Sequence, residues 1–410
     1  MQDNEKKPAL RFKGFTDPWE QRKLTNLCEK FTDGDWIEAK DQSDSGVRLV
    51  QTGNVGVTEY LDKPNNKKWI SFETFEQLHC EEVYPGDILI SRLPEPAGRA
   101  CIMPNLGTKM ITAVDCTIVR PNAVTSTRFL LQYLSSQAYF DAVNTCLAGG
   151  TRQRISRGNL AQFNVPIPSS KIEQEKIGEI LEKLDTLITL HQRKYEKLVN
   201  IKKSMLDKMF PKNGASVPEI RFKGFTDPWE QRKVGTLIED YTEKTVTQNQ
   251  YPVLTSSQQQ GIVLQEDYFA DRQVTTDNNV GYYVLPKGYF TYRSRSDTDV
   301  FVFNRNNIVD KGIISYYYPV FAPKSCDSNF LLRRLNHGIK KQLSMAAEGT
   351  GQKVLAHAKF KNMVVDVPSQ SEQEKIGTIL EELDTLITLH QRKLEKLQNI
   401  KKSCLEKMFV

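Results

Sequence analysis

Few features of this sequence are typical of a secreted or membrane protein. Among its 410 residues are only seven cysteines, and no two of them have C-x-x-C spacing. A disulfide framework and a zinc knuckle are therefore poorly supported, and the reducing cytoplasm is the expected location. No stretch approaches the roughly 18 apolar residues of a transmembrane helix. The opening residues MQDNEKKPAL lack an apolar core, so we expect no secretory signal.

The motifs of several enzyme classes are also missing. The sequence has no G-x-x-x-x-G-K-[ST] phosphate loop, no H-E-x-x-H zinc motif and no G-x-S-x-G nucleophile elbow. It also lacks the Asn-Pro-Pro-aromatic tetrapeptide with which amino-methyltransferases grip a base. Glycine-rich loops at 148–154 and 348–353 follow predicted helices instead of strands, which argues against a dinucleotide site. We therefore expect a binding protein with no catalytic residue and no metal site.

Composition sets broad limits on the partners. The net charge of +6 is mild for 410 residues, so it permits binding to a polyanion without requiring it. An ordinary basic protein would have the same charge. The length predicts two or three domains, because single cores rarely extend over so many residues.

Two long repeats are the main positive feature. PALRFKGFTDPWEQRK at 8–23 returns as PEIRFKGFTDPWEQRK at 218–233. The segment 173–210 returns at 372–409 with six substitutions. The stretches between the repeats are unlike each other. We interpret this layout as one docking surface presented twice, with two different recognition domains between the copies.

Each copy of the longer repeat predicts one long helix. Its apolar residues are spaced alternately by four and three positions, as in a heptad seam. The seam comprises Ile177, Leu181, Leu184, Ile188, His191, Tyr195 and Leu198 in the first copy, and Ile376, Leu380, Leu383, Ile387, His390, Leu394 and Leu397 in the second. We expect an antiparallel coiled coil; the alternative is two amphipathic helices, each lying on its own domain. The seam histidines could set the register or be half-exposed and neutral, and alone they do not complete a zinc site.

The two unlike segments, 24–168 and 234–368, are each long enough for a domain and share a pattern. Each begins with β-like runs set off by turn residues. Each continues with a helical stretch containing Phe-Leu-Leu, at 129–131 and 330–332, and then reaches a glycine-rich loop. We predict one scaffold with two different surfaces.

These elements predict an α+β fold. Two similar mixed α/β domains would be separated by an antiparallel coiled coil of two long helices, with an internal pseudo-twofold repeat. The predicted segments are a first domain at 1–168, a central helix at 169–210, a second domain at 211–368 and a C-terminal helix at 369–410.

Basic, amide and hydroxyl side chains gather near turns in both unlike domains. Arginine and lysine suit guanine edges or phosphates, glutamine suits adenine edges, and serine suits phosphates. Ordinary solvated loops are the alternative for any single residue. The candidate DNA contacts are Arg48, Lys67, Lys68, Arg92, Arg99, Arg152 and Arg154 in the first domain, and Ser256, Ser257, Gln258, Arg293, Arg295, Gln352 and Lys353 in the second. Arg157 also lies near the first glycine-rich loop.

Together these features resemble the specificity subunit of a type I restriction–modification system. The resemblance covers the whole chain. It is most specific in RFKGFTDPWE, before each unlike domain, and in E-Q-E-K-I-G…L-D-x-L-I-T…K-K-S…M-F, behind each. PGDILISRLPEPAGRA and YPVLTSSQQQG also read like target-recognition segments of that family.

The resemblance implies a non-catalytic function. Each unlike domain would enter the major groove and recognise half of a bipartite site in double-stranded DNA, and the paired helices would set the spacer. The repeats would dock two methyltransferase subunits, with Phe12, Phe15, Trp19, Phe222, Phe225 and Trp229 as candidate contacts. S-adenosylmethionine, ATP and Mg would bind to the methyltransferase and restriction (translocase) subunits of this bacterial or archaeal complex, and none to this chain.

Two alternatives stay open at this point. One is a coiled-coil scaffold protein without nucleic acid, and the other is a recognition protein fused to an unrecognised nuclease or methyltransferase. The glycine-rich loop reads G-T-R-Q-R in the first domain and G-T-G-Q-K in the second. A role for one loop therefore does not transfer automatically to the other.

Overall fold

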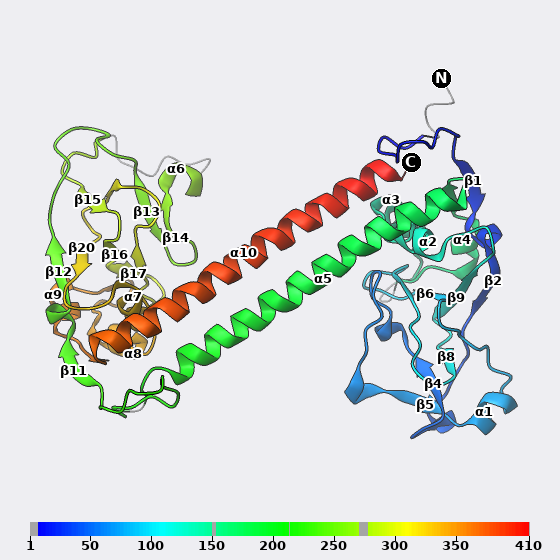
Figure 1. Ribbon diagram of the computed structural model, residues 1–410, viewed down its shortest axis with the longest axis horizontal. Helices are drawn as coiled ribbons and strands as arrows, with labels where there is room; N and C mark the ends of the chain where they lie inside the picture. The colour runs from blue at the N-terminus through cyan, green and yellow to red at the C-terminus, as the bar shows by residue number, and fades with distance from the viewer. Residues whose placement is uncertain (1–6, 150–152, 213, 270–277, 410) are drawn as a thin grey trace. The chain divides into compact units, whose positions relative to one another are not determined.

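The computed structural model describes residues 7–149, 153–212, 214–269 and 278–409. The chain forms two compact units. The first unit contains the residues up to Arg193 together with Gln391–Val410, and the second contains Lys194–His390. Helices α5 (Lys171–Lys208) and α10 (Gln370–Met408) each contribute to both units (Figure 1). Each long helix therefore begins in one unit and ends in the other.

The first domain contains two four-stranded sheets. The main sheet has the order β2 (Cys28–Asp33), β9 (Cys116–Pro121), β6 (Ile88–Ser91), β7 (Ala100–Ile102), and the other has the order β3 (Gln42–Ser43), β5 (Lys68–Ile70), β4 (Val47–Val50), β8 (Met110–Thr112). The main sheet is antiparallel throughout, whereas β4 and β8 pair in parallel. The helices are α1 (Phe72–Gln77), α2 (Thr127–Tyr133), α3 (Gln137–Thr145) and α4 (Arg157–Gln162).

The second domain has a main sheet with the same connectivity. Its order is β12 (Ile238–Tyr241), β20 (Val320–Pro323), β16 (Phe290–Tyr292), β18 (Phe303–Arg305). Three further two-stranded pairs are β13 (Leu254–Ser257) with β14 (Gly261–Leu264), β15 (Tyr283–Pro286) with β19 (Lys311–Ile314), and β17 (Arg295–Ser296) with β21 (Lys353–Val354). The helices are α6 (Gln265–Tyr268), α7 (Ser328–Asn336), α8 (Lys340–Ala346) and α9 (His357–Asn362). Two similar mixed domains on one scaffold are therefore confirmed.

The shorter repeat closes each domain against the start of a long helix. Strand β1 (Glu20–Lys23) pairs antiparallel with β10 (Asn164–Ile167), and β11 (Glu230–Lys233) pairs in the same way with β22 (Val364–Val367). Upstream of each strand an arginine makes a bidentate ion pair with a glutamate in the first turn of the helix. These pairs are Arg11 with Glu173, at 2.6 and 2.8 Å, and Arg221 with Glu372, at 2.8 and 2.8 Å. Both glutamates are buried. Each copy of the shorter repeat is thus joined to the start of the long helix that follows its own domain.

The end of each long helix completes the aromatic core of a unit. In the first unit, Phe409 contacts Trp19 and Phe129, with ring centroids 6.3 and 5.3 Å away. In the second unit, Phe210 lies 5.9 Å from Trp229 and 5.8 Å from Phe330. Backbone hydrogen bonds reinforce the contact, from Leu10 N to Lys407 O (2.8 Å) and from Ile220 N to Lys208 O (2.9 Å).

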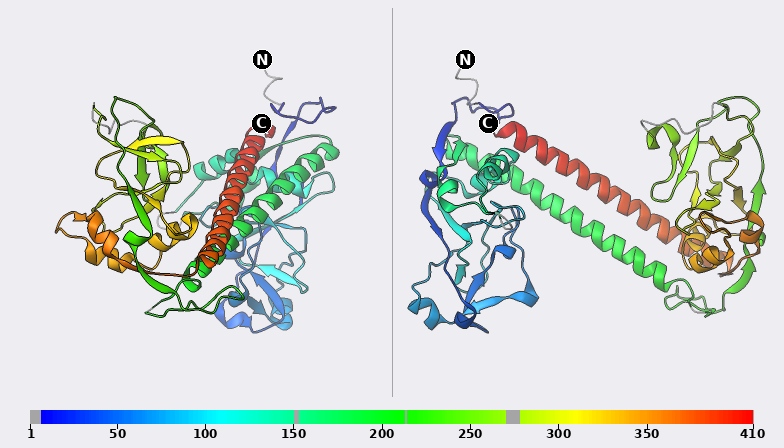
Figure 2. Two further views of the ribbon diagram at one scale, coloured as in Figure 1. Left: turned by 60° about the vertical axis from the view of Figure 1, so that its left-hand side comes forward. Right: turned by 180° about the vertical axis from the view of Figure 1, so that it is seen from behind.

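Within each unit the two long helices lie side by side and antiparallel (Figures 1 and 2). The start of one helix pairs with the end of the other. Asp185 of α5 forms an ion pair with Lys401 of α10 in the first unit, and Asp384 of α10 does so with Lys202 of α5 in the second. Gln132 Nε2 also donates to Asp185, at 2.8 Å.

Charge along the helices favours this orientation. Residues 173–185 contain five acidic and two basic side chains, whereas 191–203 contain one acidic and five basic. The second copy has the same bias. Antiparallel packing places the acidic part of one helix beside the basic part of the other, and parallel packing would place like charges together.

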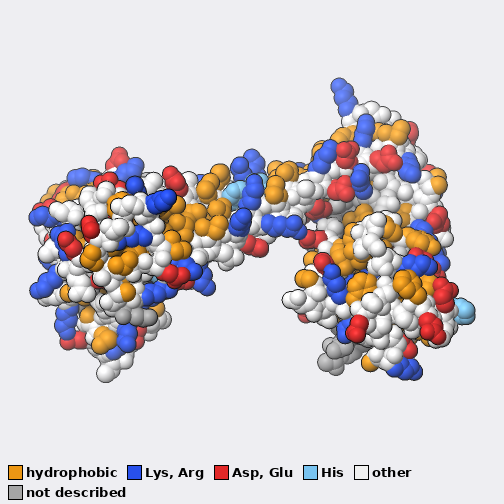
Figure 3. Space-filling view, turned by 60° about the horizontal axis from the view of Figure 1, so that its bottom comes forward, with side chains coloured by type: hydrophobic (Ala, Val, Ile, Leu, Met, Phe, Trp, Pro, Cys, Tyr) orange, Lys and Arg blue, Asp and Glu red, His pale blue; other side chains and the backbone are white. Residues whose placement is uncertain are grey.

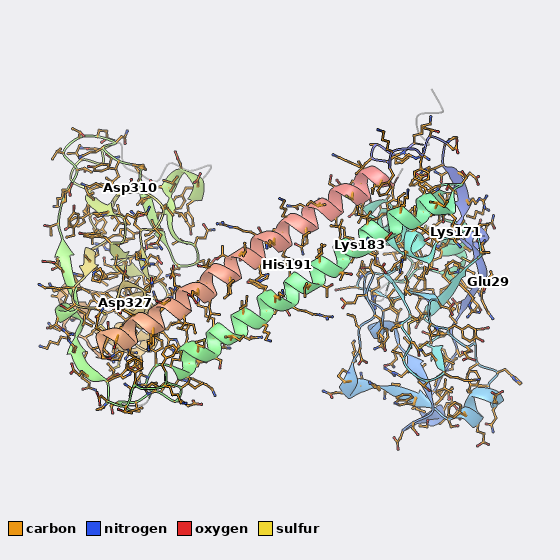
Figure 4. The ribbon with its side chains drawn as sticks, in the orientation of Figure 1. Glu29, Lys171, Lys183, His191, Asp310 and Asp327 are labelled. Atoms are coloured by element: carbon orange, nitrogen blue, oxygen red, sulfur yellow. The ribbon has the colours of Figure 1, made fainter. Side chains whose placement is uncertain are left out.

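The predicted seam has two environments. The first seam residues belong to the cores of the domains: Ile177 and Leu181 in the first unit, and Ile376, Leu380 and Leu383 in the second. Further along, the side chains are half-buried, except that Leu394 is buried. The histidines are half-buried, and Figure 4 shows His191 midway along α5. Each helix therefore lies on its own domain over its first turns and follows the other helix beyond them.

One glycine in each repeat permits the helix to approach its domain. A Cβ built on Gly178 would lie 2.7 Å from the backbone nitrogen of Phe129, and one on Gly377 would lie 2.9 Å from that of Phe330. Both distances are shorter than side-chain packing allows. The helix interior therefore accepts glycine despite its unfavourable helix propensity.

Replacing Gly178 by alanine is therefore expected to destabilise the protein. On propensity alone, alanine would add about 1 kcal/mol of stability at a helix interior. The steric overlap with α2 should reverse the sign and cost about 1–3 kcal/mol. Urea denaturation of Gly178→Ala and Gly377→Ala measures this, and a stabilised variant would contradict the close approach.

The Asp185–Lys401 ion pair should show energetic coupling. Both side chains are mostly buried, with 23% and 14% exposure. A double-mutant cycle with Asp185→Asn and Lys401→Met should give a coupling free energy of about 1 kcal/mol. Lys402→Met, at the exposed neighbouring position, is the control and should be additive with Asp185→Asn. Additivity in both cycles would remove this pair from the forces that orient the helices.

Candidate nucleic-acid interface

Arg99, a predicted DNA contact, is occupied inside the first domain. It is 8% exposed. Its guanidinium donates to the carbonyl oxygens of Val55 (2.6 Å), Leu93 (2.6 Å), Pro96 (3.0 Å) and Thr52 (2.9 Å). Burial lowers the pKa of this guanidinium from its ordinary value. Arg99 thus ties two loops together, and we remove it from the proposed DNA contacts.

Arg48 also has a structural environment. It is 2% exposed, lies 5.6 Å from the Trp69 ring and donates to the Lys68 carbonyl at 2.7 Å. We remove Arg48 from the proposed contacts for the same reason. Lys68 itself is half-buried in β5, whereas Lys67 is exposed, 3.9 Å from Asp62. Lys67 therefore stays a candidate on this side of the first domain.

Arg92 is buried and shares the carboxylate of Asp115 with an exposed arginine, Arg154. It is 8% exposed and forms ion pairs with Asp33, at 3.6 Å, and Asp115, at 3.9 Å. Arg154 is exposed and lies 3.5 Å from Asp115. It closes the glycine-rich loop through two backbone hydrogen bonds with Ala148, of 2.9 and 3.0 Å. Arg152, also predicted, lies outside the described residues. Arg92 itself is too deep to touch DNA in this conformation.

In the second domain the structure brings four predicted residues together. Strands β17 and β21 place Arg295 opposite Val354 and Ser296 opposite Lys353. Arg295 is exposed and stacks on Tyr317, with 4.5 Å from guanidinium carbon to ring centroid. The Tyr317 ring thus holds the Arg295 guanidinium at the surface, where it could donate hydrogen bonds to a base edge or a phosphate.

Asp297 links the segment after β16 that contains Arg293 and Arg295, here called the arginine loop, to the glycine-rich loop of this domain. Asp297 lies 3.8 Å from Arg293 and accepts a 2.9 Å hydrogen bond from Gln352 Nε2. Arg293 and Arg295 also line a pocket of about 380 Å³ with Tyr317 and Tyr318. The predicted cluster of arginine and amide side chains therefore exists as one exposed face.

The two predicted serines of β13 already have hydrogen-bond partners within the second domain. Ser256 Oγ accepts from Asn304 Nδ2 at 2.8 Å. Ser257 is buried, and its Oγ accepts from the backbone N–H groups of Gln259 (3.2 Å) and Gln260 (3.1 Å). Gln258, at the tip, is exposed. Of the three residues, only Gln258 keeps an exposed side chain for a partner.

Some residues of these faces escaped the sequence prediction. Tyr316 and Tyr317 are 52% and 45% exposed, although three consecutive tyrosines near β-like sequence favour a core position. Asp33 and Asp297 were not predicted, and Asp115 was expected to be a solvated turn carboxylate, because carboxylates near turns are usually solvated. Figure 3 shows Lys and Arg side chains dispersed over the visible face, so charge alone does not locate these sites.

The aromatic residues of the shorter repeat divide into two groups. Trp19 and Trp229 are 2% and 3% exposed and belong to the cores, so their predicted docking role is not supported. Phe12 and Phe222 are half-buried against the same cores. The remaining pair matches across the repeats: Phe15 lies 5.2 Å from Lys176 Nζ, and Phe225 lies 4.8 Å from Lys375 Nζ. These two half-buried rings are the better docking candidates.

Two other kinds of feature are absent from the described part of the chain. No group of three or more His, Cys, Asp or Glu residues there is placed to hold a metal ion. No helix there is both long enough and apolar enough to cross a membrane.

Comparison with known proteins agrees with the duplicated fold. The family model of the type I restriction modification DNA specificity domain matches residues 16–200 and again 227–399. A putative type I restriction enzyme MjaX specificity subunit from Methanocaldococcus jannaschii is 20% identical over 407 residues, covering 94% of this chain and 91% of that protein. The crystal structure of the type I restriction–modification S subunit from M. genitalium matches with a TM-score of 0.57 and 14% identity. That match covers 98% of this chain and 99% of the other, and it shows a shared fold.

Buried and exposed arginines should respond differently to substitution. Arg99→Met leaves four carbonyl oxygens without their donor and is expected to lower the free energy of unfolding by about 3 kcal/mol. Arg295→Met removes an exposed side chain and should change it by less than about 1 kcal/mol. Thermal or urea denaturation checks both, and equal losses would contradict the structural role of Arg99.

Proposed function

The chain belongs to the type I restriction modification DNA specificity family, and from this premise we propose that it recognises a bipartite site in double-stranded DNA. Each unlike domain would recognise one half. The observation that carries the proposal is the contrast between a repeated frame and unrepeated loops. The order of the main sheet, the Arg–Glu ion pairs and the aromatic contacts recur in both units.

The recognition loops occupy matched places with different chemistry. Ile155 N donates to Arg92 O at 3.2 Å, and Leu355 N donates to Ser294 O at 2.8 Å. These bonds fix the segment after each glycine-rich loop against the strand that ends at the arginine loop. One domain has a buried arginine at this position, and the other has a serine. Different side chains on one scaffold would present different base preferences.

The paired helices would set the spacer between the half-sites. Helices α5 and α10 contain 38 and 39 residues without interruption. Each is anchored at its start by an ion pair and at its end by a phenylalanine. A rod of fixed length, with about 1.5 Å and 100° per residue, would define both the distance and the rotation between two recognition domains.

The repeated surface would dock two copies of one partner. Phe15 with Lys176 and Phe225 with Lys375 present the same ring and charge twice. We assign this surface to two methyltransferase subunits, which would carry S-adenosylmethionine. Restriction subunits would carry ATP and Mg. The chain itself would supply recognition, and the catalytic groups would belong to its partners.

Exchanging one domain should change one half of the methylated site. We would replace residues 24–163 by the matching segment of another specificity subunit, which keeps β1, β10 and α5. Methylome sequencing of cells that carry the methyltransferase and this chimera should show one new half-site with the other half and the spacer unchanged. Exchange of 234–363 is the matched control and should change the opposite half. A change in both halves from either exchange would contradict two separate recognition domains.

A further inference from the structure

Five charged side chains of the first domain alternate in sign along one path. Arg157 Nε lies 3.5 Å from Asp33 Oδ2, and Arg92 Nε lies 3.6 Å from Asp33 Oδ1. On the other side, Arg92 Nη2 lies 3.9 Å from Asp115 Oδ1, and Arg154 Nη1 lies 3.5 Å from the same oxygen. The path thus runs from one exposed arginine through two carboxylates and a buried arginine to a second exposed arginine. It joins the end of β2, the loops of Arg92, Asp115 and Arg154, and the start of α4.

Arg92 is the fixed centre of this path. It is 8% exposed, and its Nη2 donates to the carbonyl oxygen of Val114 at 2.5 Å. Its Nε is buried without a hydrogen-bond partner. A buried cation between two carboxylates offsets the repulsion that would otherwise separate them. Asp33 is held further by Thr117 Oγ1, which donates at 2.9 Å.

The two end arginines are exposed and only loosely paired. Their side chains are 60% exposed for Arg154 and 46% for Arg157. Their distances to the carboxylates exceed the roughly 2.7–3.2 Å of an N–H···O hydrogen bond. Both guanidinium groups therefore have N–H donors that a ligand can use. The neighbouring carboxylates restrict where these two side chains lie. Such restraint lowers the entropic cost of binding.

The chemistry of the path favours a base over a phosphate. A phosphate at either end would meet a carboxylate as well as an arginine, and the five side chains together have a net charge of only +1. Guanine presents two neutral acceptors, O6 and N7, in the major groove, and these match the arginine fork. The cytosine amino group of the same base pair can donate a hydrogen bond to a nearby carboxylate.

We propose that Arg154 and Arg157 each recognise a guanine in the half-site of the first domain, and that Arg92 positions both through Asp115 and Asp33. This inference rests on the proposed function. Among the described residues of the second domain, this five-residue path is not repeated. Ser294 replaces Arg92 there and donates to the Tyr317 carbonyl at 2.7 Å. The two half-sites would accordingly be recognised by different means.

The direct test uses the complete complex with its methyltransferase and a duplex containing the methylated motif. Each guanine of the first half-site is replaced in turn by 7-deazaguanine, which lacks the N7 acceptor. The wild-type complex should bind two of these duplexes roughly 5- to 150-fold more weakly. Arg154→Ala should abolish the penalty at one guanine and Arg157→Ala at the other. A uniform loss for all duplexes with a smaller salt dependence would instead reassign both arginines to phosphates and overturn the proposal.

The positioning role has its own readout. Asp115→Asn should weaken discrimination only at the guanine of Arg154, and Asp33→Asn only at that of Arg157. Arg92→Met should weaken both, with an unchanged salt dependence. Arg120→Met, a half-buried arginine of the same domain that pairs with Asp87 outside the path, is the control and should keep both preferences. If Arg92→Met does not fold, the two asparagine variants decide alone, and unchanged discrimination in both would refute the role of Arg92.

Failure of this inference differs from failure of the proposed function. If exchange of 24–163 changes one half-site but the arginine variants keep full guanine discrimination, only the arginine assignment is wrong. If the wild-type complex methylates no bipartite motif, both proposals fall. A first half-site without guanine would refute the assignment directly.

Discussion

The packing of a phenylalanine at the end of each long helix is the contact on which the rest of the structure depends. Phe409 completes the core around Trp19 and Phe129, and Phe210 completes the core around Trp229 and Phe330. Each ring enters a unit on a helix that begins in the other unit. The first core therefore needs residues from the far end of the chain, whereas the second core lies within Lys194–His390. The repeats have to stay alike because the same contact is made twice, with the same ion pairs and the same close helix approach around it.

This constraint separates the repeated frame from the proposed recognition surface. The repeats use their aromatic, glycine and charged residues to hold helices and strands together, which leaves the loops between them free to differ. The arginine loop after β6 or β16 and the glycine-rich loop near α4 or α9 lie together in both domains. On the proposed function, specificity would change through loop residues while the proposed docking surfaces and the helices remain constant.

The frame could be predicted from the sequence because its signals are local and repeated. Heptad spacing gave both helices, and matched Phe-Leu-Leu stretches gave the common scaffold. The candidate recognition residues could not be predicted in the same way. Arg99 and Arg295 both stand near turns, but one is buried among four carbonyls and the other is exposed. Asp33 and Asp115 meet Arg92 only in the folded domain. Trp19 looked like a surface anchor because it is repeated, although repetition reflects its place in the core.

The most direct test of this account is a truncation that removes residues 404–410. These residues belong to the first unit, although the second domain precedes them in sequence. Hydrogen–deuterium exchange should then show loss of protection in β1 and β10 of the first domain, while β11 and β22 of the second keep theirs. Loss of protection confined to the second domain, or no loss in either, would contradict the claim that the end of each long helix completes the core of the unit in which the other long helix begins.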